Sequence, residues 1–138
     1  MSDQEALEFL AHGTRTGKLA TVRADGRPHV ASIWFAVEDR DLVFNTWHTS
    51  VKARNLRRDP RVALIVDYDV PPFGYVIVEG TASISEDLAE VRRIATVVGG
   101  RYMGADRAEE FGARNGVEGE LAVRLAIEKS IGRDNVSD

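Results

Sequence analysis

The spacing of apolar side chains changes along this chain from a helical period to alternation and back again. Residues 3–12 place apolar side chains at a helical spacing, and Gly13 follows as a stop signal. Residues 18–23 alternate, and an Asp-Gly turn signal separates them from a second extended run at 28–37. A third run, 41–47, follows a charged turn. This pattern predicts a short leading helix and then an antiparallel meander of three strands.

The middle of the chain predicts a short helix between strands. Residues 52–58 are rich in good helix formers, and Asp59 ends the helix because Pro60 pushes the preceding residue out of the helical region. Residues 61–68 are too apolar to alternate, so we expect this strand to be covered on both faces. Residues 73–85 predict a further strand, in which Gly80 is a candidate bulge that lets the strand bend.

After residue 86 the helical period returns and a last strand follows. Apolar residues recur at helical spacing up to Gly99 and Gly100, residues 106–114 suggest another short helix, and residues 119–131 alternate again. About six strands with inserted helices, and no repeating strand–helix–strand rhythm, predict an α+β domain built on an antiparallel barrel. The length of 138 residues suits one such domain, spanning 1–138.

Composition narrows the possible functions. The absence of cysteine excludes disulfides, thiolate zinc sites and thiol catalysis. A net charge of −4 argues against general nucleic-acid affinity, which needs a basic surface. No apolar run approaches the ~20 residues that span a bilayer, and the acidic start lacks the apolar segment of a signal peptide. We therefore expect a cytoplasmic protein that binds neither nucleic acid nor membranes.

The most informative candidate chemistry lies where the third strand-like run gives way to a helix. This run ends in hydroxyl side chains, and Ser50 and Lys52 follow at the helix start. Unpaired N–H groups and the helix dipole make such a position a ready site for a phosphate. Ser50 would supply a hydroxyl and Lys52 a cation. A plain helix N-cap explains the same residues, so both interpretations stay open at this point.

Other charged residues gather beside this turn. Four arginines lie within eight residues: Arg54, Arg57, Arg58 and Arg61. They form either a solvated helix face or a basic rim for an anionic ligand larger than one phosphate. The three histidines have no metal-ligand or nucleophile spacing, so no metal site is predicted. His48, beside the turn, is either a surface-loop residue or a proton donor to a reduced substrate.

Five segments resemble the split β-barrel flavin-binding proteins, the pyridoxamine 5′-phosphate oxidase-like group, in sequence and spacing: residues 26–35, 44–46, 50–52, 55–62 and 78–82. The resemblance spans about residues 17 to 85. It implies a six-stranded antiparallel split β-barrel with short flanking helices. Within the group the chain looks most like the B branch of the flavin/deazaflavin oxidoreductases. Members of that branch commonly use coenzyme F420, a deazaflavin with a phosphate and a polyglutamate tail.

The resemblance implies roles for individual residues around the cofactor phosphate. Ser50 and Lys52 match the family residues that bind the phosphate. Asn45 and Thr46 match the pair that contacts phosphate and ribityl. Three arginines would meet the tail carboxylates, which FMN does not have: Arg54, Arg57 and Arg58.

The resemblance also implies residues along the cofactor ring. The backbone of one strand is expected to follow the ring: Ser32, Ile33, Trp34 and Phe35. Tyr75 aligns with a polar position beside the ring. Aromatic side chains here either stack on the ring or the substrate or fill the core. Substrate-facing residues are expected from residues 68–73 and from Tyr102 and Met103.

The resemblance further implies a homodimer with a cofactor in each of two clefts between subunits. We expect an F420H2-dependent reductase that transfers a hydride to a small conjugated or electron-poor organic acceptor, without a catalytic triad, because the reduced ring itself carries the hydride. An FMN-binding oxidoreductase on the same fold and a non-catalytic carrier of F420, heme or a tetrapyrrole are the alternatives. Val51 replaces the arginine typical of pyridoxamine phosphate oxidases, and no tryptophan lies near the C-terminus, so pyridoxine phosphate oxidation is not expected.

Overall fold

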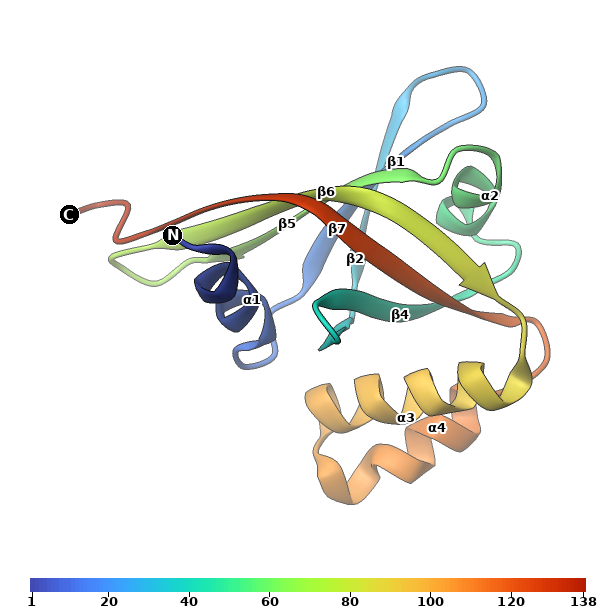
Figure 1. The fold of residues 1–138 in the computed structure, drawn as a ribbon. Helices are drawn as coiled ribbons and strands as arrows, with labels where there is room; N and C mark the ends of the chain where they lie inside the picture. The colour runs from blue at the N-terminus through green and yellow to red at the C-terminus, as the bar shows by residue number, and fades with distance from the viewer.

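The computed structural model describes all 138 residues. The chain forms one curved antiparallel sheet with helices at its margins (Figure 1). The strands are β1 (Gly17–Val22), β2 (Pro28–Ile33), β3 (Ala36–Glu38), β4 (Asp41–Trp47), β5 (Arg61–Tyr68), β6 (Gly74–Ser85) and β7 (Glu120–Asp134). The helices are α1 (Asp3–Ala11), α2 (Val51–Arg58), α3 (Leu88–Met103) and α4 (Ala108–Asn115), with the 3-10 turn η1 (Ala105–Arg107) between α3 and α4. The predicted α+β class is confirmed, but the sheet has seven strands where six were expected.

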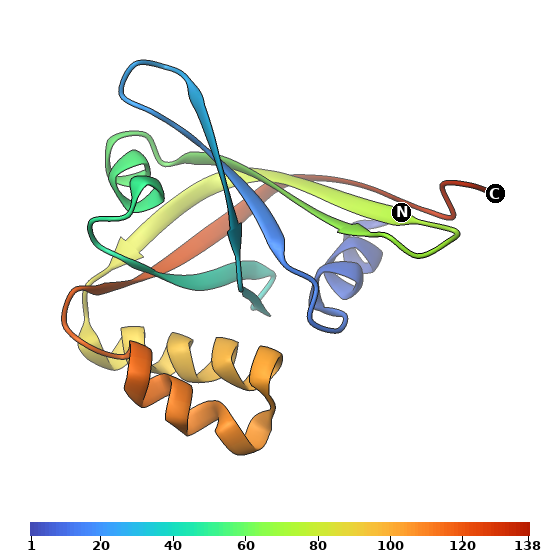
Figure 2. The ribbon, with the colours of Figure 1, turned by 180° about the vertical axis from the view of Figure 1, so that it is seen from behind.

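The strand order explains how the sheet closes into a split barrel. The order is β2-β1-β5-β6-β7-β4-β3, so β2 and β3, consecutive in the chain, lie at opposite edges. Only Trp34 and Phe35 separate these strands. A link of this length spans about 11 Å at most, so the two edges must meet there. Figures 1 and 2 show the strongly curled sheet from its two sides.

The predicted three-stranded meander is confirmed only in part. β1 and β2 form the expected hairpin, and Ala36 and Val37, at the end of the second predicted run, pair with β4. β4 is not a neighbour of β2, however, and its other partner is β7. The run predicted as one strand over 28–37 is two strands, because Phe35 and Ala36 are both buried and break the alternation. Alternating apolar residues show that a segment is extended, but they do not show which segment it pairs with.

Two predictions about the central strands have different outcomes. The register between β6 and β7 shifts between Glu79 and Gly80, which confirms the predicted bulge. A Cβ at Gly80 would overlap the carbonyl oxygen of Ala126, so a side chain has no room there. β5 was expected to be buried on both faces, but in the single chain only one face is buried. Val62, Leu64 and Val66 are buried, whereas the residues between them are only half-buried.

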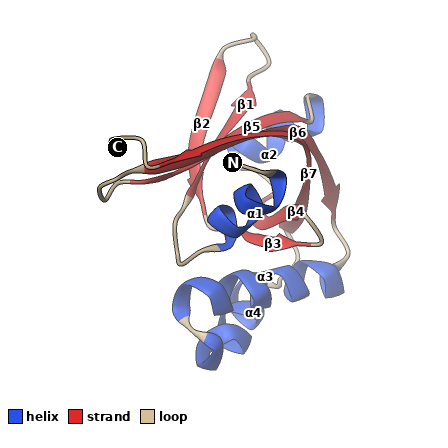
Figure 3. Cartoon of the chain, turned by 60° about the vertical axis from the view of Figure 1, so that its left-hand side comes forward, coloured by secondary structure: helices blue, strands red, loops and turns tan.

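Helices α3 and α4 form a hairpin that packs beside the barrel (Figure 3). α3 does not stop at Gly99 and Gly100 as predicted but continues to Met103. Gly99 lies where α4 crosses α3 closely, and a Cβ there would overlap the Cβ of Phe111. Val91, Ile94 and other buried residues of α3 form a small second core with β3, β4 and β7. No helix of this structure combines the length and the hydropathy that a membrane span requires.

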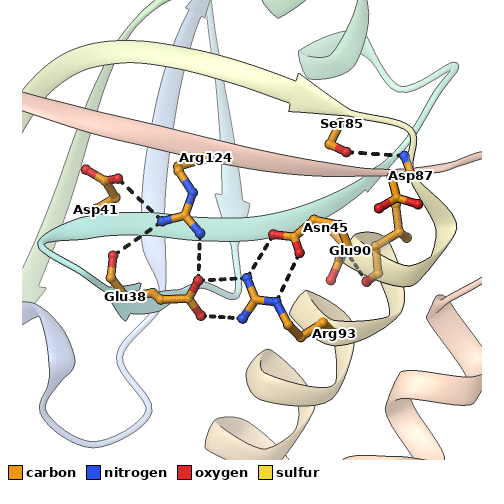
Figure 4. Close-up of polar contacts among 9 residues, drawn as sticks. Glu38, Asp41, Asn45, Ser85, Asp87, Glu90, Arg93 and Arg124 are labelled. Carbon is orange, nitrogen blue, oxygen red and sulfur yellow. Dashed lines mark hydrogen bonds and ion pairs between the residues drawn. The ribbon is translucent and has the colours of Figure 1, made fainter.

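An ion-pair network fixes α3 to the barrel (Figure 4). Arg93 of α3 donates to both carboxylate oxygens of Glu38, at 2.8 and 2.7 Å, and also to Glu90. Arg124 of β7 donates to the same Glu38 carboxylate at 2.6 Å and to Asp41 at 3.4 Å. Hydrogen bonds from Arg93 first, and then from Arg124, hold the pKa of Glu38 at about 2. The network joins four elements, because Glu38 lies in β3, Asp41 in β4, Arg93 in α3 and Arg124 in β7.

Candidate functional site

A cleft of about 300 Å³ lies between the barrel and the α3–α4 hairpin. Five of the predicted site residues line it from β2, β4 and α2 and the residue after β2: Ser32, Ile33, Trp34, Asn45 and Lys52. The helical hairpin supplies the other wall with Ala95, Val98, Gly99, Phe111 and Asn115. Residues from four separate parts of the chain thus meet in one concave space, the usual setting of a small-molecule site.

Ser50 and Thr46 lie together at the turn between β4 and α2. The Ser50 hydroxyl caps the helix by accepting a hydrogen bond from the backbone N–H of Ala53 at 3.2 Å, and it lies 2.7 Å from the Thr46 hydroxyl. Thr46 is buried. The N-cap interpretation of Ser50 is therefore confirmed. The N–H groups of Val51 and Lys52 precede the intrahelical hydrogen bonds, so an anion at this helix start would use them.

Lys52 is the cation of this cleft. Its side chain is half-buried, lines the cleft and forms no ion pair. Glu120, at the start of β7, is affected by this charge. Burial raises the pKa of the Glu120 carboxyl, and the Lys52 ammonium lowers it. A half-buried ammonium without a carboxylate partner favours binding of an anionic group.

Asn45 lines the cleft, but its amide nitrogen is already engaged. Nδ2 donates to the carbonyl oxygens of Val91 at 3.2 Å and Leu121 at 3.5 Å, which ties β4 to α3 and β7. Only Oδ1 is left for a ligand, and this oxygen accepts hydrogen bonds but does not donate them. The residue therefore suits a hydroxyl group of a ligand better than a phosphate oxygen.

The predicted ring-side residues divide into an exposed and a buried set. Trp34 is 43% exposed and stacks on Tyr102, with ring centroids 4.8 Å apart and an angle of 7° between the planes. The side chains of Ile33 and Phe35 are buried in the core. The Phe35 N–H donates to the Tyr102 hydroxyl at 3.3 Å, and its carbonyl accepts from Arg101 at 2.6 Å. Both backbone polar groups of Phe35 thus have partners within the protein, and Phe35 does not line the cleft.

The three predicted tail-binding arginines do not act as one group. Arg57 pairs with Glu86 at 2.7 Å and faces a different cleft. Arg58 donates to the carbonyl oxygen of Val22 at 2.7 Å and to Asn55 at 2.9 Å, so it links α2 to β1. Arg54 is exposed and forms no ion pair. Of the three, Arg54 alone has no partner within the protein.

Tyr75 and His48 lie outside the cleft. Tyr75 pairs with Asp67 and Arg133 across neighbouring strands and lies on the outer face of the sheet. Within one chain it does not line the cleft. His48 is exposed, and its Nδ1 lies 3.0 Å from the carbonyl oxygen of Gly119. It lines a separate cleft and not the one that contains Lys52.

Several residues of the cleft wall were not found from the sequence. Phe111 and Asn115 lie on a short helix without a recognisable motif, and Phe111 is tilted against Trp34 at a centroid distance of 6.4 Å. Tyr102 was expected to face the substrate, but it lies against the indole of Trp34 and its hydroxyl donates to the carbonyl oxygen of Arg15 at 2.7 Å. The packing of α3 and α4, which local patterns do not encode, places these residues.

The sheet is antiparallel and curled, and its edge strands β2 and β3 are joined by Trp34 and Phe35. This sheet, with the cleft that Trp34 lines, defines a split β-barrel protein. The chain matches the family model described as pyridoxamine 5′-phosphate oxidase over residues 2–130, and it belongs to this family.

Solved structures extend the comparison. A conserved hypothetical protein from Mycobacterium tuberculosis is 32% identical, with a TM-score of 0.85 over 99% of this chain and 87% of that one. A structure described as an F420 reductase is 29% identical, with a TM-score of 0.70 over 90% of this chain and 94% of that one. A heme storage protein from Vibrio cholerae, 21% identical with a TM-score of 0.72 over 95% and 94% of the two chains, shares the fold alone.

Proposed function

We propose that this protein is an F420H2-dependent reductase that transfers a hydride to a small conjugated or electron-poor organic acceptor. One observation carries the proposal: the cleft brings Lys52, without any carboxylate partner, together with Trp34 and the end of β2. The 29% identity to a structure described as an F420 reductase, over 90% of this chain, supports the choice of cofactor.

The residues present fit a phosphorylated flavin-type cofactor. The Lys52 ammonium, the Ser50 hydroxyl and the first N–H groups of α2 would hold the phosphate. Asn45 would accept a hydrogen bond from a ribityl hydroxyl through Oδ1. Trp34 and the end of β2 would flank the ring. When bound, reduced F420 supplies the hydride, while the chain binds, orients and excludes water.

The proposed functional unit is a homodimer. In one chain the outer face of the sheet exposes 67% of Val30 and 50% of Ile131, and it also carries Tyr75. A second copy packed on this face would bury these side chains. It would also offer a route for Tyr75 of one chain to reach the cleft of the other, which its position in a single chain does not allow.

An FMN-dependent reductase using the same cleft is the second candidate. Arg57 is paired with Glu86, and Arg58 is bonded to β1 and to Asn55, so Arg54 is the one arginine of the three that would reach a polyglutamate tail without giving up a contact within the protein. FMN has no tail and does not need these arginines. Its phosphate would use the same Lys52 and Ser50.

Anaerobic titration of the protein with F420, and separately with FMN, distinguishes these candidates. We expect tighter binding of F420, and a loss of ten- to a hundredfold in affinity for Lys52→Ala, because a charge-assisted phosphate contact contributes ~1.5–3 kcal/mol. Arg92→Ala is the control, since Arg92 is exposed on α3, lines neither cleft and forms no ion pair. Absence of F420 binding, or equal affinity of the two variants, would contradict the proposal.

Turnover is tested separately with reduced F420 and a panel of quinones, nitroaromatic compounds and enones. Oxidation of bound F420H2 by at least one acceptor, slowed by Lys52→Ala and not by Arg92→Ala, is the expected result. Binding without oxidation by any acceptor would instead indicate a carrier of the cofactor.

A further inference from the structure

A second and larger cleft lies at the end of the molecule where three turns meet. Its volume is about 830 Å³, within the range of small-molecule sites. The turns are those between β4 and α2, between β6 and α3, and between α4 and β7, and both opposite views show them side by side (Figures 1 and 2). The cofactor cleft and this second cleft share none of their lining residues.

The second cleft contains an exposed aromatic platform. Trp47 is 44% exposed and Leu88 is 50% exposed, although both are large apolar side chains. Gly119, with a positive φ of 97°, places its backbone against the indole, and a Cβ there would overlap the ring of Trp47. The indole is therefore held in place by the turn before β7. An aromatic surface that is fixed and yet open to solvent favours stacking of a planar ligand.

The unpaired polar groups of the second cleft are hydrogen-bond acceptors. His48 Nδ1 lies 3.0 Å from the carbonyl oxygen of Gly119, and because a carbonyl only accepts, Nδ1 carries the proton. In the neutral imidazole Nε2 is then an acceptor. Glu118 and Glu120 form no ion pair, whereas Arg57 is already paired with Glu86 at 2.7 Å. The cleft therefore offers carboxylates and an imidazole nitrogen but no free cation.

We propose that the second cleft binds a planar aromatic cation, such as an arylamidinium or a protonated arylamine. A cation over the face of a tryptophan is the strongest of the cation–π pairs, and Trp47 supplies that face. Glu118 and Glu120 would accept the N–H groups of the ligand and balance its charge. Burial raises the pKa of the Glu120 carboxyl and the Lys52 ammonium lowers it, and a bound cation would add to the effect of Lys52 by stabilising the ionised form. This preference is opposite to that of the cofactor cleft, where Lys52 attracts anions.

Two-dimensional ¹H–¹⁵N NMR of the full chain tests this proposal with benzamidine as the probe. The chain has two tryptophans, so two indole N–H signals are expected, and Trp34→Phe assigns them. Benzamidine should shift the Trp47 signal in a saturable way at low millimolar concentration and leave the Trp34 signal in place. Benzamide, its neutral isostere, should bind at least tenfold more weakly.

Variants identify the groups responsible. Trp47→Leu and the pair Glu118→Gln with Glu120→Gln should each weaken benzamidine binding at least tenfold, followed through backbone signals of the turn before β7. Glu109→Gln, an exposed glutamate on α4 without an ion pair, should not change it. The same spectra show whether each variant is folded, and Glu118→Gln alone is the milder change because Glu118 is exposed. Equal affinity for benzamidine and benzamide, or no saturable shift of the Trp47 signal up to ~20 mM, would overturn the proposal.

Discussion

Replacing Glu38 by glutamine removes the charge that two arginines share. Glu38 is the centre of the network in Figure 4, because its carboxylate accepts hydrogen bonds from both Arg93 and Arg124. Its side chain is only 21% exposed. After Glu38→Gln each arginine keeps one acid, Glu90 for Arg93 and Asp41 for Arg124. The variant therefore tests the shared carboxylate without leaving a guanidinium unpaired.

The magnitude follows from the pKa of Glu38. This pKa falls from 4.5 to about 2 on folding, and a difference of about 2.5 units corresponds to about 3 kcal/mol. Solvent screening of the partly exposed arginines lowers the expected loss to about 1–3 kcal/mol in the free energy of unfolding at pH 7. A carboxyl with a lowered pKa stabilises the folded protein above its unfolded value of 4.5. That contribution disappears as the pH falls towards 2, and by about pH 3 less than half remains.

Urea denaturation followed by circular dichroism at pH 7, 5 and 3 measures this effect. The difference in free energy of unfolding between the wild type and Glu38→Gln should be largest at pH 7, nearly the same at pH 5, and clearly smaller at pH 3. Glu109→Gln is the control and should stay within about 0.5 kcal/mol of the wild type at pH 7. A wild type and a Glu38→Gln variant that lose stability in parallel from pH 7 to pH 3 would refute the assigned role of the network.

Three further substitutions test local contacts by urea denaturation. Asn55→Ala removes the partner of the buried Thr21 hydroxyl, 3.0 Å away, and should lower the free energy of unfolding by about 2–3 kcal/mol. The same substitution should cost less in a Thr21→Val background, and fully additive losses would exclude this pairing. Ser50→Ala removes the cap of α2 and should cost about 1 kcal/mol, so unchanged stability would argue against the cap. Gly112→Ala should lower the free energy of unfolding by about 1–3 kcal/mol because the new Cβ overlaps the Thr96 hydroxyl, and adding Thr96→Ala should recover part of this loss. A Gly112→Ala variant more stable than the wild type would show that α3 and α4 separate easily.

Much of the local structure could be predicted because its signals lie within a few residues. Ser50 caps α2 and Asp59 follows its end, as the N-cap residue and the proline at position 60 indicate. The bulge at Gly80 was also found, since a glycine inside a long strand marks a close backbone approach.

The pairing of distant segments could not be predicted in the same way. β4 pairs with β7, which places Leu42 opposite Leu125, and no local pattern specifies a partner so far along the chain. Gly99 was interpreted as a stop, but the close crossing of α4 makes a glycine favourable inside α3. Tertiary packing overrides helix propensity at this position.

The candidate site likewise combines a local feature that the sequence predicts with contacts between distant segments that it does not. Neighbouring residues predict the turn before α2 as a candidate phosphate site, and the structure places Lys52 in a cleft. The arginines after it looked equivalent in sequence, yet Arg57 and Arg58 have partners at Glu86 and Val22, on other elements. Whether a charge is free for a ligand depends on those partners, which only the folded chain reveals.

The α3–α4 hairpin interrupts two strands that are direct neighbours. Ser85 at the end of β6 is already in register with Ala122 of β7, so the barrel ladder is complete without the helices between them. The hairpin nevertheless supplies half of the wall of the cleft around Lys52, including Val98 and Phe111. Buried side chains of α3 and the ion pair between Arg93 and Glu38 tie it to the barrel, so a replacement hairpin would need to keep these contacts. Grafting such a hairpin between Ser85 and Ala122 is therefore a direct route to altering which small molecules fit the cleft.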